Sequence, residues 1–477
     1  MSMNDSTTKS PFRVVVVGAG VAGLVLSNAL QRAGIDHVVL EKHKEIVWAS
    51  GASIGIWPNG ARVLDQLGCF DAVQNACADM TAFYTRGSDG KALNVSHLFD
   101  LITERHGCRF LLLERKEFLK HLYECLPSKS PVRTGCEVSR ISESPDGVRV
   151  FLKDGSHEDG DMVVGCDGVA SQVRQLMWYN ANKAHPGSIS NKEMKSLTAS
   201  YKCLVGVATP VRGVELNAMT VVHNDGFSFL LLTQPHMIFF FVFIKHDRTY
   251  HWPEFPRYTK DDADMCAASL AALPVNDNVL FGDIWANRIR GELINVEEVV
   301  FQHWHAGRIV LVGDAAHKVT PNIALGGMCA IESAASLVNH VRAKLHASPL
   351  GLSSHPSTQE LSGLFQAYRD QRAPRVLQIF RLSALMTREQ AWHNPLYKAV
   401  ARFVVPHMSD ATVGSVFSDA VKGAVKLEFL PLQTKFAGTV DWVDDSGKSM
   451  TTTKSWGLMA AIVLAFLICV YTYKVSL

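Results

Sequence analysis

Residues 12–32 read FRVVVVGAGVAGLVLSNALQR, and this stretch decides the fold. The apolar run 12–17 predicts a buried parallel strand, and the end of the stretch predicts an amphipathic helix. Between them Gly18 would make a tight turn, Gly20 would let the backbone approach a pyrophosphate, and Gly23 would let helix and strand pack closely. The phosphates would lie at the helix N-terminus, where free amides and the helix dipole favour negative charge.

A second apolar strand follows at residues 37–40 and ends in Glu41. This carboxylate lies at the distance from the first glycine that is typical of the acid accepting hydrogen bonds from an adenosine ribose. Glycine turns occur in many folds, so the glycine pattern alone is weak. Strand, helix, second strand and terminal acid together indicate an α/β, Rossmann-like domain that binds a dinucleotide. They leave open which dinucleotide it is.

Two later segments bear on that question. Residues 308–312 form another apolar strand that ends in Gly313 and Asp314, and a helix is expected to begin near Gly326 and Gly327. A carboxylate at this strand end can hold the ribityl hydroxyls of a flavin, and the helix amides would point at the flavin ring. Residues 161–168 form a strand that closes on an Asp167–Gly168 turn, a pair that is common in any fold when taken by itself.

In this order the three motifs resemble the FAD fingerprints of the flavin aromatic hydroxylase superfamily, which has the para-hydroxybenzoate hydroxylase fold. Within it, the chain is most similar to the fungal FAD-dependent monooxygenases of meroterpenoid and indole-diterpene biosynthesis, several of which epoxidise a prenyl chain. The resemblance covers residues 12–345. It is sharpest in GASIGIWPNG at residues 51–60 and HKVTPN at residues 317–322.

The resemblance implies which residues contact FAD. They are Glu41, Gly55, Arg115, Asp314 and Gly327, with Asp167 near the pyrophosphate and a passing NADPH. Relatives often carry Gly-Gln-Gly after the proline where this chain has Ala324-Leu325-Gly326-Gly327, so the ring contacts could differ. Arg115 opens a predicted helix, where the dipole disfavours a cation unless an anion such as the cofactor offsets it. The alternative for Arg115 is an ordinary solvent-exposed side chain.

The sequence has no second Gly-x-Gly-x-x-Gly pattern for a separate nicotinamide domain and no His/Cys cluster with metal spacing, so no metal site is predicted. We therefore predict an FAD-dependent, NADPH-consuming monooxygenase that inserts one oxygen atom from O2 through a flavin C4a-hydroperoxide. The favoured reaction is epoxidation of the prenyl chain of a meroterpenoid intermediate. The alternatives are an aromatic-ring hydroxylase acting on a phenolic or polyketide substrate, and a non-catalytic FAD-binding membrane scaffold.

The domain organisation follows from the order of these motifs. Residues 12–184 and 301–345 are predicted to form the FAD-binding domain, and residues 185–300 an inserted mixed β-sheet domain that binds substrate. Apolar runs predict strands at residues 201–207, 228–232 and 237–243. Their phenylalanines would line the substrate site or simply fill the core of the sheet. A helical region at 346–440 and a polar linker at 441–455 are expected to follow.

Two residues have unsettled roles. Tyr201 lies where relatives carry a tyrosine that is thought to orient substrate through its hydroxyl, and it is the one catalytic candidate. The alternative is an ordinary strand aromatic. His317 would touch substrate or merely cap a turn, and no catalytic role is assigned to it.

The eighteen uncharged residues 456–473 lie between Lys454 and Lys474. As a helix they would be about 27 Å long, enough to cross a thin bilayer. They predict one C-terminal transmembrane helix, with a buried core helix as the alternative. The catalytic domain would then lie on the cytosolic side of a membrane, expected to be the endoplasmic reticulum.

Composition narrows the possible partners. A formal net charge of +2 argues against nucleic acid, and the ten scattered cysteines suggest reduced thiols. The expected partners are a hydrophobic prenylated aromatic substrate, O2 and the membrane. The resemblance adds a neighbouring prenyltransferase and a neighbouring terpene cyclase.

Overall fold

The structure is a computed structural model that describes residues 11–47 and 51–446. Its first sheet grows outward from the valine run of the glycine-rich stretch. Strand β1 (Arg13–Val17) lies between β2 (Asp36–Glu41) and β11 (Met162–Gly165) and is parallel to both. Because β1 has a neighbour on each side, its four valines are buried, as expected for the centre of a parallel sheet.

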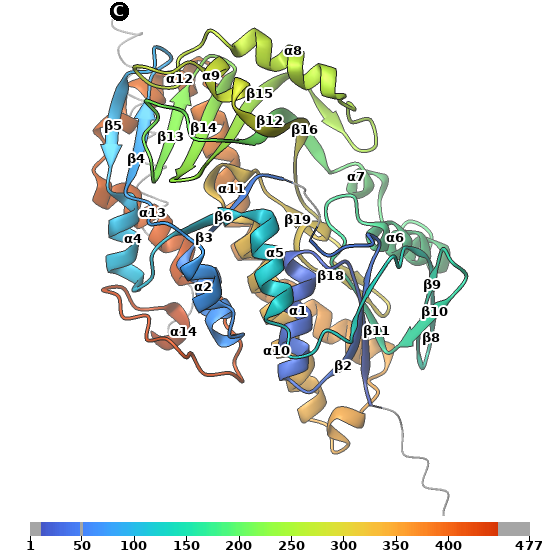
Figure 1. Cartoon of the computed structure of the whole chain (residues 1–477). Coiled ribbons are helices and arrows are strands. Elements are labelled where there is room, and N and C mark those ends of the chain that lie inside the picture. Colours follow the sequence, from blue (N-terminus) through green and yellow to red (C-terminus); the bar gives the residue numbers. More distant parts are fainter. Residues whose placement is uncertain (1–10, 48–50, 447–477) are drawn as a thin grey trace, which may run out of the picture.

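Within the described residues, this sheet has six strands in the order β17-β18-β11-β1-β2-β7. The outer strands are β7 (Val132–Thr134), β18 (Ile309–Leu311) and β17 (His305–Ala306), which is antiparallel to β18. Helices α1 (Val21–Arg32), α5 (Arg115–Glu124) and α10 (Gly326–His346) pack together beside it (Figure 1). The predicted strand–helix–strand–acid unit and its Rossmann-like class are confirmed.

The second large sheet lies at the other end of the molecule (Figure 1). In the same part of the chain, it has the order β19-β16-β12-β15-β14-β13-β4-β5. Its strands are β4 (Ala82–Arg86), β5 (Ala92–Ser96), β12 (Thr198–Ala208), β13 (Ala218–His223), β14 (Phe227–Gln234), β15 (Met237–His251), β16 (Arg288–Val300) and β19 (His317–Lys318). β4 pairs in parallel with β13, so this mixed sheet also recruits strands from before residue 185. The domain boundaries given above stay a prediction.

The two faces of this sheet pack against different neighbours. On the outer face, Leu204, Phe229 and Phe240 join a separate apolar cluster with α8 (Lys260–Leu270) and α9 (Phe281–Ala286). Side chains alternate along a strand, so the intervening residues point the other way, toward the main core. We call this side the inner face. Its central residues are Tyr201, Cys203, Val205, Val207, Met219, Val221, His223, Ser228, Leu230, Leu232, Phe239, Phe241 and Phe243.

Helix α11 (Thr358–Gln390) connects the two sheets, since it packs against α10 and also against β13 and β16. At 33 residues it is about 50 Å long. Its contact with α10 is fixed by a fully buried charge cluster, in which Arg372 and Arg375 donate to the carboxylate of Glu332. Asn59 donates to the same carboxylate.

The smaller elements complete the two sheets and the chain end. The other strands are β3 (Ser53–Ile56), β6 (Leu111–Glu114), β8 (Val138–Ser144), β9 (Gly147–Leu152) and β10 (His157–Gly160). The other helices are α2 (Pro58–Gln66), α3 (Phe70–Asn75), α4 (Leu98–His106), α6 (Gln172–Ala184), α7 (Asn191–Met194), α12 (Pro395–Phe403), α13 (Asp410–Lys422) and α14 (Val443–Ser446). Short 3-10 turns lie at Gly313–Ala315, Pro321–Ile323, Gly351–Ser353 and Val405–His407.

The chain beyond α13 runs back over α2. The Asp65 carboxylate accepts hydrogen bonds from the backbone of Gln433 and Thr434, and Arg62 pairs with Asp444. Among the described residues, none of the helices is long and apolar enough to cross a membrane. The predicted transmembrane segment 456–473 lies outside the described residues.

Candidate active site

The glycine-rich loop has the geometry that its pattern predicts. Gly18 has φ +99°, a conformation that side chains disfavour, and its N–H donates to the Leu40 carbonyl at 2.8 Å. A Cβ on Gly23 would lie 1.9 Å from the Gly18 carbonyl oxygen. A Cβ on Gly20 would meet no described atom within 4 Å. Two of the glycines are therefore needed for packing inside the protein, whereas Gly20 leaves bare backbone at the start of α1.

The start of α1 can receive an anion. It has no side-chain cap and no acidic residue in its first turn, so its amides and dipole are free to face phosphate. Glu41 is buried at the end of β2, where its carboxylate accepts from the backbone N–H of Ala19 at 2.8 Å and of His43 at 2.9 Å. These bonds fix the carboxylate beside the glycine loop, as expected of a ribose-binding acid.

Asp167 follows β11 and lies behind the same loop. A Cβ on Gly18 would come within 2.9 Å of the Asp167 Cα. The Asp167 carboxylate turns into the start of α6, where it accepts from the Ser171 hydroxyl at 2.5 Å and the Val173 N–H at 3.0 Å. Burial raises its pKa, and these hydrogen bonds oppose the rise. In this structure Asp167 supports the cofactor loop by capping a helix.

Asp314 belongs to a compact group of charges at the end of β18. Lys318 donates to its carboxylate at 2.6 Å. Burial lowers the pKa of Lys318, but the Asp314 charge and hydrogen bond and the Glu297 charge outweigh burial and raise it overall. Burial lowers the pKa of Arg115 and the Asp314 charge opposes that, so the guanidinium at the start of α5 also lies near this group.

Sequence reasoning identified Asp314 and Arg115 but assigned no role to Lys318 or Glu297. The available signal for Lys318 was its position four residues after Asp314, inside the HKVTPN segment. Burial raises the pKa of Glu297 and the Lys318 charge opposes it. The group therefore offers cations for cofactor phosphates and a carboxylate for hydroxyl groups.

Gly55 and Gly327 lie where α10 begins. A Cβ on Gly55 would approach Phe110 to 2.4 Å and Ala324 to 2.8 Å, and one on Gly327 would approach Ile54 to 2.9 Å. Helix α10 starts at residue 326 as predicted, with no side-chain cap and no acid in its first turn. These glycines bring the start of α10 close to β3, so the unpaired amides can face a flavin ring that enters between them.

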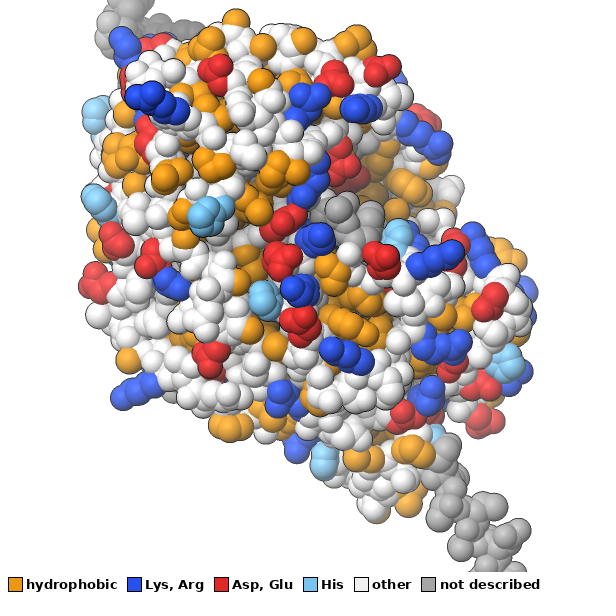
Figure 2. Space-filling model, viewed as in Figure 1, with side chains coloured by type: hydrophobic (Ala, Val, Ile, Leu, Met, Phe, Trp, Pro, Cys, Tyr) orange, Lys and Arg blue, Asp and Glu red, His pale blue; other side chains and the backbone are white. Residues whose placement is uncertain are grey.

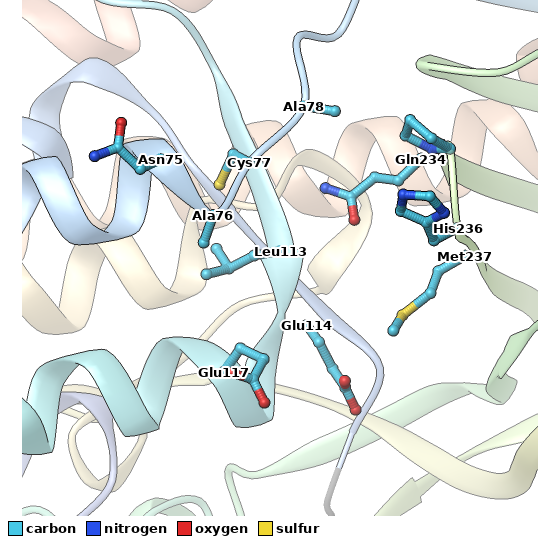
Figure 3. A pocket seen from close by; sticks show the side chains of 11 residues that line it. Asn75, Ala76, Cys77, Ala78, Leu113, Glu114, Glu117, Gln234, His236 and Met237 are labelled. Atoms are coloured by element: carbon cyan, nitrogen blue, oxygen red, sulfur yellow. The ribbon is translucent and has the colours of Figure 1, made fainter.

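A cavity of about 400 Å³ opens beside the start of α5 (Figure 3). Its lining residues are Asn75, Ala76, Cys77, Ala78, Leu113, Glu114, Glu117, Gln234, Pro235, His236 and Met237. They come from the end of α3 and the chain after it, from β6 and α5, and from the β14–β15 turn with the strand residues on either side of it. Gln234 and Met237 continue the rows of the inner face, so the cavity lies at one end of that face.

Tyr201 and His317 are both buried. The Tyr201 hydroxyl lies 2.7 Å from Nδ1 of His393, which follows α11, and burial raises the pKa of this phenol. His317 Nε2 lies 3.1 Å from the Ser333 hydroxyl, and burial lowers the pKa of this imidazole to about 4. Both side chains are neutral at pH 7. Tyr201 contributes to the inner face, whereas His317 lies against α10.

The charges on the molecular surface are mixed. Figure 2 shows Lys and Arg side chains interspersed with Asp and Glu on one face of the molecule. Polyanions bind to broad strips of positive charge. Among the described residues visible in this view, no such strip is present.

Comparison with known proteins identifies the family. Residues 12–360 match the FAD binding domain family, and the chain belongs to it. It is 38% identical to the FAD-dependent monooxygenase DEP2 of Alternaria brassicicola over 91% of this chain and 82% of that protein. It is 36% identical to the FAD-dependent monooxygenase penE of Penicillium thymicola over 94% of each chain.

Solved structures agree on the fold. Klebsiella pneumoniae HpxO complexed with FAD and uric acid superposes with a TM-score of 0.70 at 22% identity, covering 86% of this chain and 96% of that one. Tetracycline destructase Tet(51) superposes with a TM-score of 0.60 at 14% identity, covering 88% of this chain and 99% of that one. The prediction of an FAD-dependent monooxygenase is confirmed, and the bare Gly20 backbone and uncapped helix starts fit FAD.

Proposed function

We propose that this monooxygenase consumes NADPH and epoxidises the prenyl chain of a prenylated aromatic intermediate of meroterpenoid type. The observation that carries the proposal is the apolar inner face. Leu230, Leu232, Phe239 and Phe241 lie on neighbouring strands and point to the same side. A hydrocarbon chain can lie on such a surface without leaving any protein hydrogen bond unmade.

The residues of the chain would bind and orient. The start of α1 and Glu41 would hold the adenosine diphosphate part of FAD, and Asp314 with the start of α10 would hold the ribityl and ring parts. Bound FAD supplies the activation of O2 and the transfer of one oxygen atom. An alkene attacks electrophilic oxygen without prior loss of a proton, so the protein needs to exclude water and orient the chain. The buried inner face does both.

Tyr201 would orient substrate through its hydroxyl. Its raised pKa keeps the phenol protonated, so it can donate or accept a hydrogen bond but does not act as a base at pH 7. Tyr201→Phe keeps the ring and removes the bond to His393. We expect a several-fold higher KM and more NADPH consumed per product, with FAD still bound. A Tyr201→Phe enzyme that matches wild type in both would remove this role.

A second reaction has one observation in its favour. Phe241 and Phe243 lie nearly parallel on the inner face, 6.2 Å apart with an interplanar angle of 5°. An aromatic ring could stack on this pair, which would favour hydroxylation of the ring in place of epoxidation of the chain.

The two reactions differ in where the oxygen goes. Full-length enzyme would be incubated with NADPH, labelled O2 and a farnesylated phenolic acid ester, and in parallel with the same ring lacking the chain. Label in an epoxide of the chain supports our proposal. Label on the ring of either compound supports the hydroxylase. If neither compound stimulates NADPH consumption while NADPH still reduces the bound FAD, the proposed substrate class is wrong.

We also propose a membrane location through residues 456–473, with the catalytic domain on the cytosolic side of the endoplasmic reticulum. A neighbouring prenyltransferase would supply the substrate and a neighbouring terpene cyclase would consume the epoxide. The test compares the full chain with a chain ending at residue 455 in membrane pelleting. Equal pelleting of both would contradict the anchor.

A further inference from the structure

At the far end of the inner face, four buried polar atoms lack hydrogen-bond partners among the described residues. They are Nδ1 of His223, Oγ of Ser228, Oε1 of Glu389 and Nε1 of Trp392. All four residues are less than a tenth exposed. Leaving a polar atom buried and unpaired is unfavourable, so four in one place need an explanation.

The four side chains converge from strands β13 and β14 and from the end of α11 with the chain just after it. His223 and Ser228 face each other across β13 and β14, so both point from the inner face. Glu389 lies at the end of α11, where Oε1 is 3.7 Å from His223 Nδ1. The rings of His223 and Trp392 have centroids 6.5 Å apart. The His223–Glu389 distance is too long for a hydrogen bond, yet one oxygen atom of a ligand could bond to both.

The elements that carry the cluster are fixed in place. Gly226 in the β13–β14 turn donates its N–H to the Ala391 carbonyl at 2.9 Å, and Lys245 donates to the His393 carbonyl at 3.0 Å. On the other side, Asn322 donates to the Gln390 side chain at 2.7 Å. Because the end of α11 is tied both to the sheet and to the loop before α10, its polar atoms cannot easily turn away to find other partners.

The cluster carries little charge at neutral pH. Burial raises the pKa of Glu389 to about 8, so this carboxyl is mainly protonated. Burial lowers the pKa of His223 to about 4, although a hydrogen bond to the Glu389 backbone opposes the fall, so the imidazole is neutral. The set offers N–H and O–H donors and oxygen and nitrogen acceptors. A carboxylate or phosphate would enter without a counter-charge, whereas a hydroxyl or carbonyl group finds hydrogen-bond donors and acceptors there.

Its place on the inner face suggests how a substrate lies. Ser228 and Gln234 are six residue positions apart on β14, a length of about 20 Å, and Gln234 lines the cavity at the other end. Between them the inner face of β14 and β15 is apolar. A molecule with one oxygenated end and a long hydrocarbon chain matches this order of polar and apolar surface.

We propose that His223, Ser228, Glu389 and Trp392 form a binding site for a neutral oxygen-bearing group, a hydroxyl or carbonyl, at the head of the substrate. The hydrocarbon chain then lies along the inner face toward Gln234. This inference rests on the proposed function, since it gives the head of the prenylated substrate a place. The competing explanation is a buried water molecule that satisfies the same atoms.

The test uses two probes that differ by one hydroxyl, 3-farnesylphenol and farnesylbenzene. Their Kd values for full-length holoenzyme are measured from the change in flavin absorbance. We expect wild type to bind the phenol at least tenfold more tightly. Ser228→Ala, His223→Phe and Glu389→Leu should each reduce that ratio toward one while leaving the Kd of farnesylbenzene within about threefold. Glu389→Gln, which stays neutral and can still hydrogen-bond, should keep most of the preference.

His106→Phe is the matched control. His106 is also buried, and burial lowers its pKa to about 4, but its partner is Ser418. It should leave the probe ratio unchanged. If wild type binds the two probes with equal Kd, or if neither probe changes the flavin absorbance, the inference is overturned and a buried water is favoured. Variants that weaken the binding of both probes equally would also overturn it. If Glu389→Leu does not fold, Ser228→Ala still decides.

The outcomes separate this inference from the proposed function. A tenfold ratio in binding with no oxygen added to the chain would reject the epoxidase and keep the head-group site. Epoxidised product together with equal Kd values for the two probes would keep the epoxidase and reject the head-group site.

Discussion

Alanine at Gly20 and at Gly23 should separate cofactor binding from protein stability. At Gly23 the new Cβ would lie 1.9 Å from the Gly18 carbonyl oxygen, so the two backbones must move apart by about 1.5 Å to reach ordinary contact. The loop has little room to yield, because a Cβ on Gly18 itself would stand 2.7 Å from the Cys166 carbonyl. Overpacking of this kind costs about 1–3 kcal/mol, and Gly23→Ala should lose that much even without FAD.

Gly20→Ala behaves differently because its Cβ meets nothing within 4 Å among the described residues. The backbone there has φ −75° and ψ −166°, which alanine adopts freely. The apoprotein should therefore keep its stability to within about 0.5 kcal/mol. The added methyl group would stand where bare backbone approaches the pyrophosphate, so the Kd for FAD should rise at least tenfold.

The assay uses urea unfolding of each apoprotein and a fluorescence titration with FAD. Since a ligand stabilises the folded state by RT ln(1 + [L]/Kd), the gain in Tm on adding FAD should also shrink in Gly20→Ala. A Gly20→Ala protein that binds FAD as wild type does would refute the assignment of this loop to the pyrophosphate. An apoprotein as unstable as Gly23→Ala would show that Gly20 serves packing instead.

Three further outcomes follow from buried or paired charges. Glu332→Gln leaves two buried arginines uncompensated and should lower the free energy of unfolding in urea by about 3–5 kcal/mol. The pKa of the wild-type carboxyl is lowered to about 2, so its contribution to stability is present above pH 4.5 and lost as the pH falls toward 2. Asp314→Ala removes the carboxylate paired with Lys318, and should raise the Kd for FAD ten- to a hundredfold in the fluorescence titration. Burial raises the pKa of Glu389 to about 8, so the stability due to its protonated form is fully present below pH 4.5 and lost as the pH rises through 8. Glu389→Gln should remove this dependence of the unfolding free energy on pH. The unfolding free energies of the two proteins should then converge or cross between pH 4.5 and 8. An unchanged pH dependence would place the carboxyl in water.

The strand–helix–strand unit expected to hold the cofactor was predictable because its parts are local in the sequence. Gly18, Gly20, Gly23 and Glu41 lie within one strand–helix–strand unit, and each part of that unit is set by nearby residues. The start of α10 at residue 326 and the strand before Asp314 were predicted for the same reason. Lys318 went without a role, since its importance depends on burial next to Asp314, which a sequence does not display.

The substrate side depends on contacts between distant residues. Nothing in residues 82–96 indicates that β4 would pair with β13, more than a hundred residues later. Likewise His223 and Glu389 are far apart in the sequence, and an isolated histidine or glutamate usually lies on the surface. Their burial, and hence their neutral state at pH 7, follows only once α11 is packed against the sheet.

Because the cofactor and substrate contacts lie on different elements, substrate selectivity can change independently of FAD binding. The loops expected to hold FAD follow β1, β2, β11 and β18, all in the first sheet. The proposed head-group cluster and the inner face belong to the second sheet and the end of α11. One of the contacts between the two regions lies where Thr387 bonds to Thr320 and Asn322 in the loop before α10. Substitutions on the inner face away from that contact should change which substrate binds and leave FAD affinity intact. Thr387→Val should instead affect both substrate choice and FAD affinity, because it removes the hydrogen bonds from the end of α11 to the loop before α10.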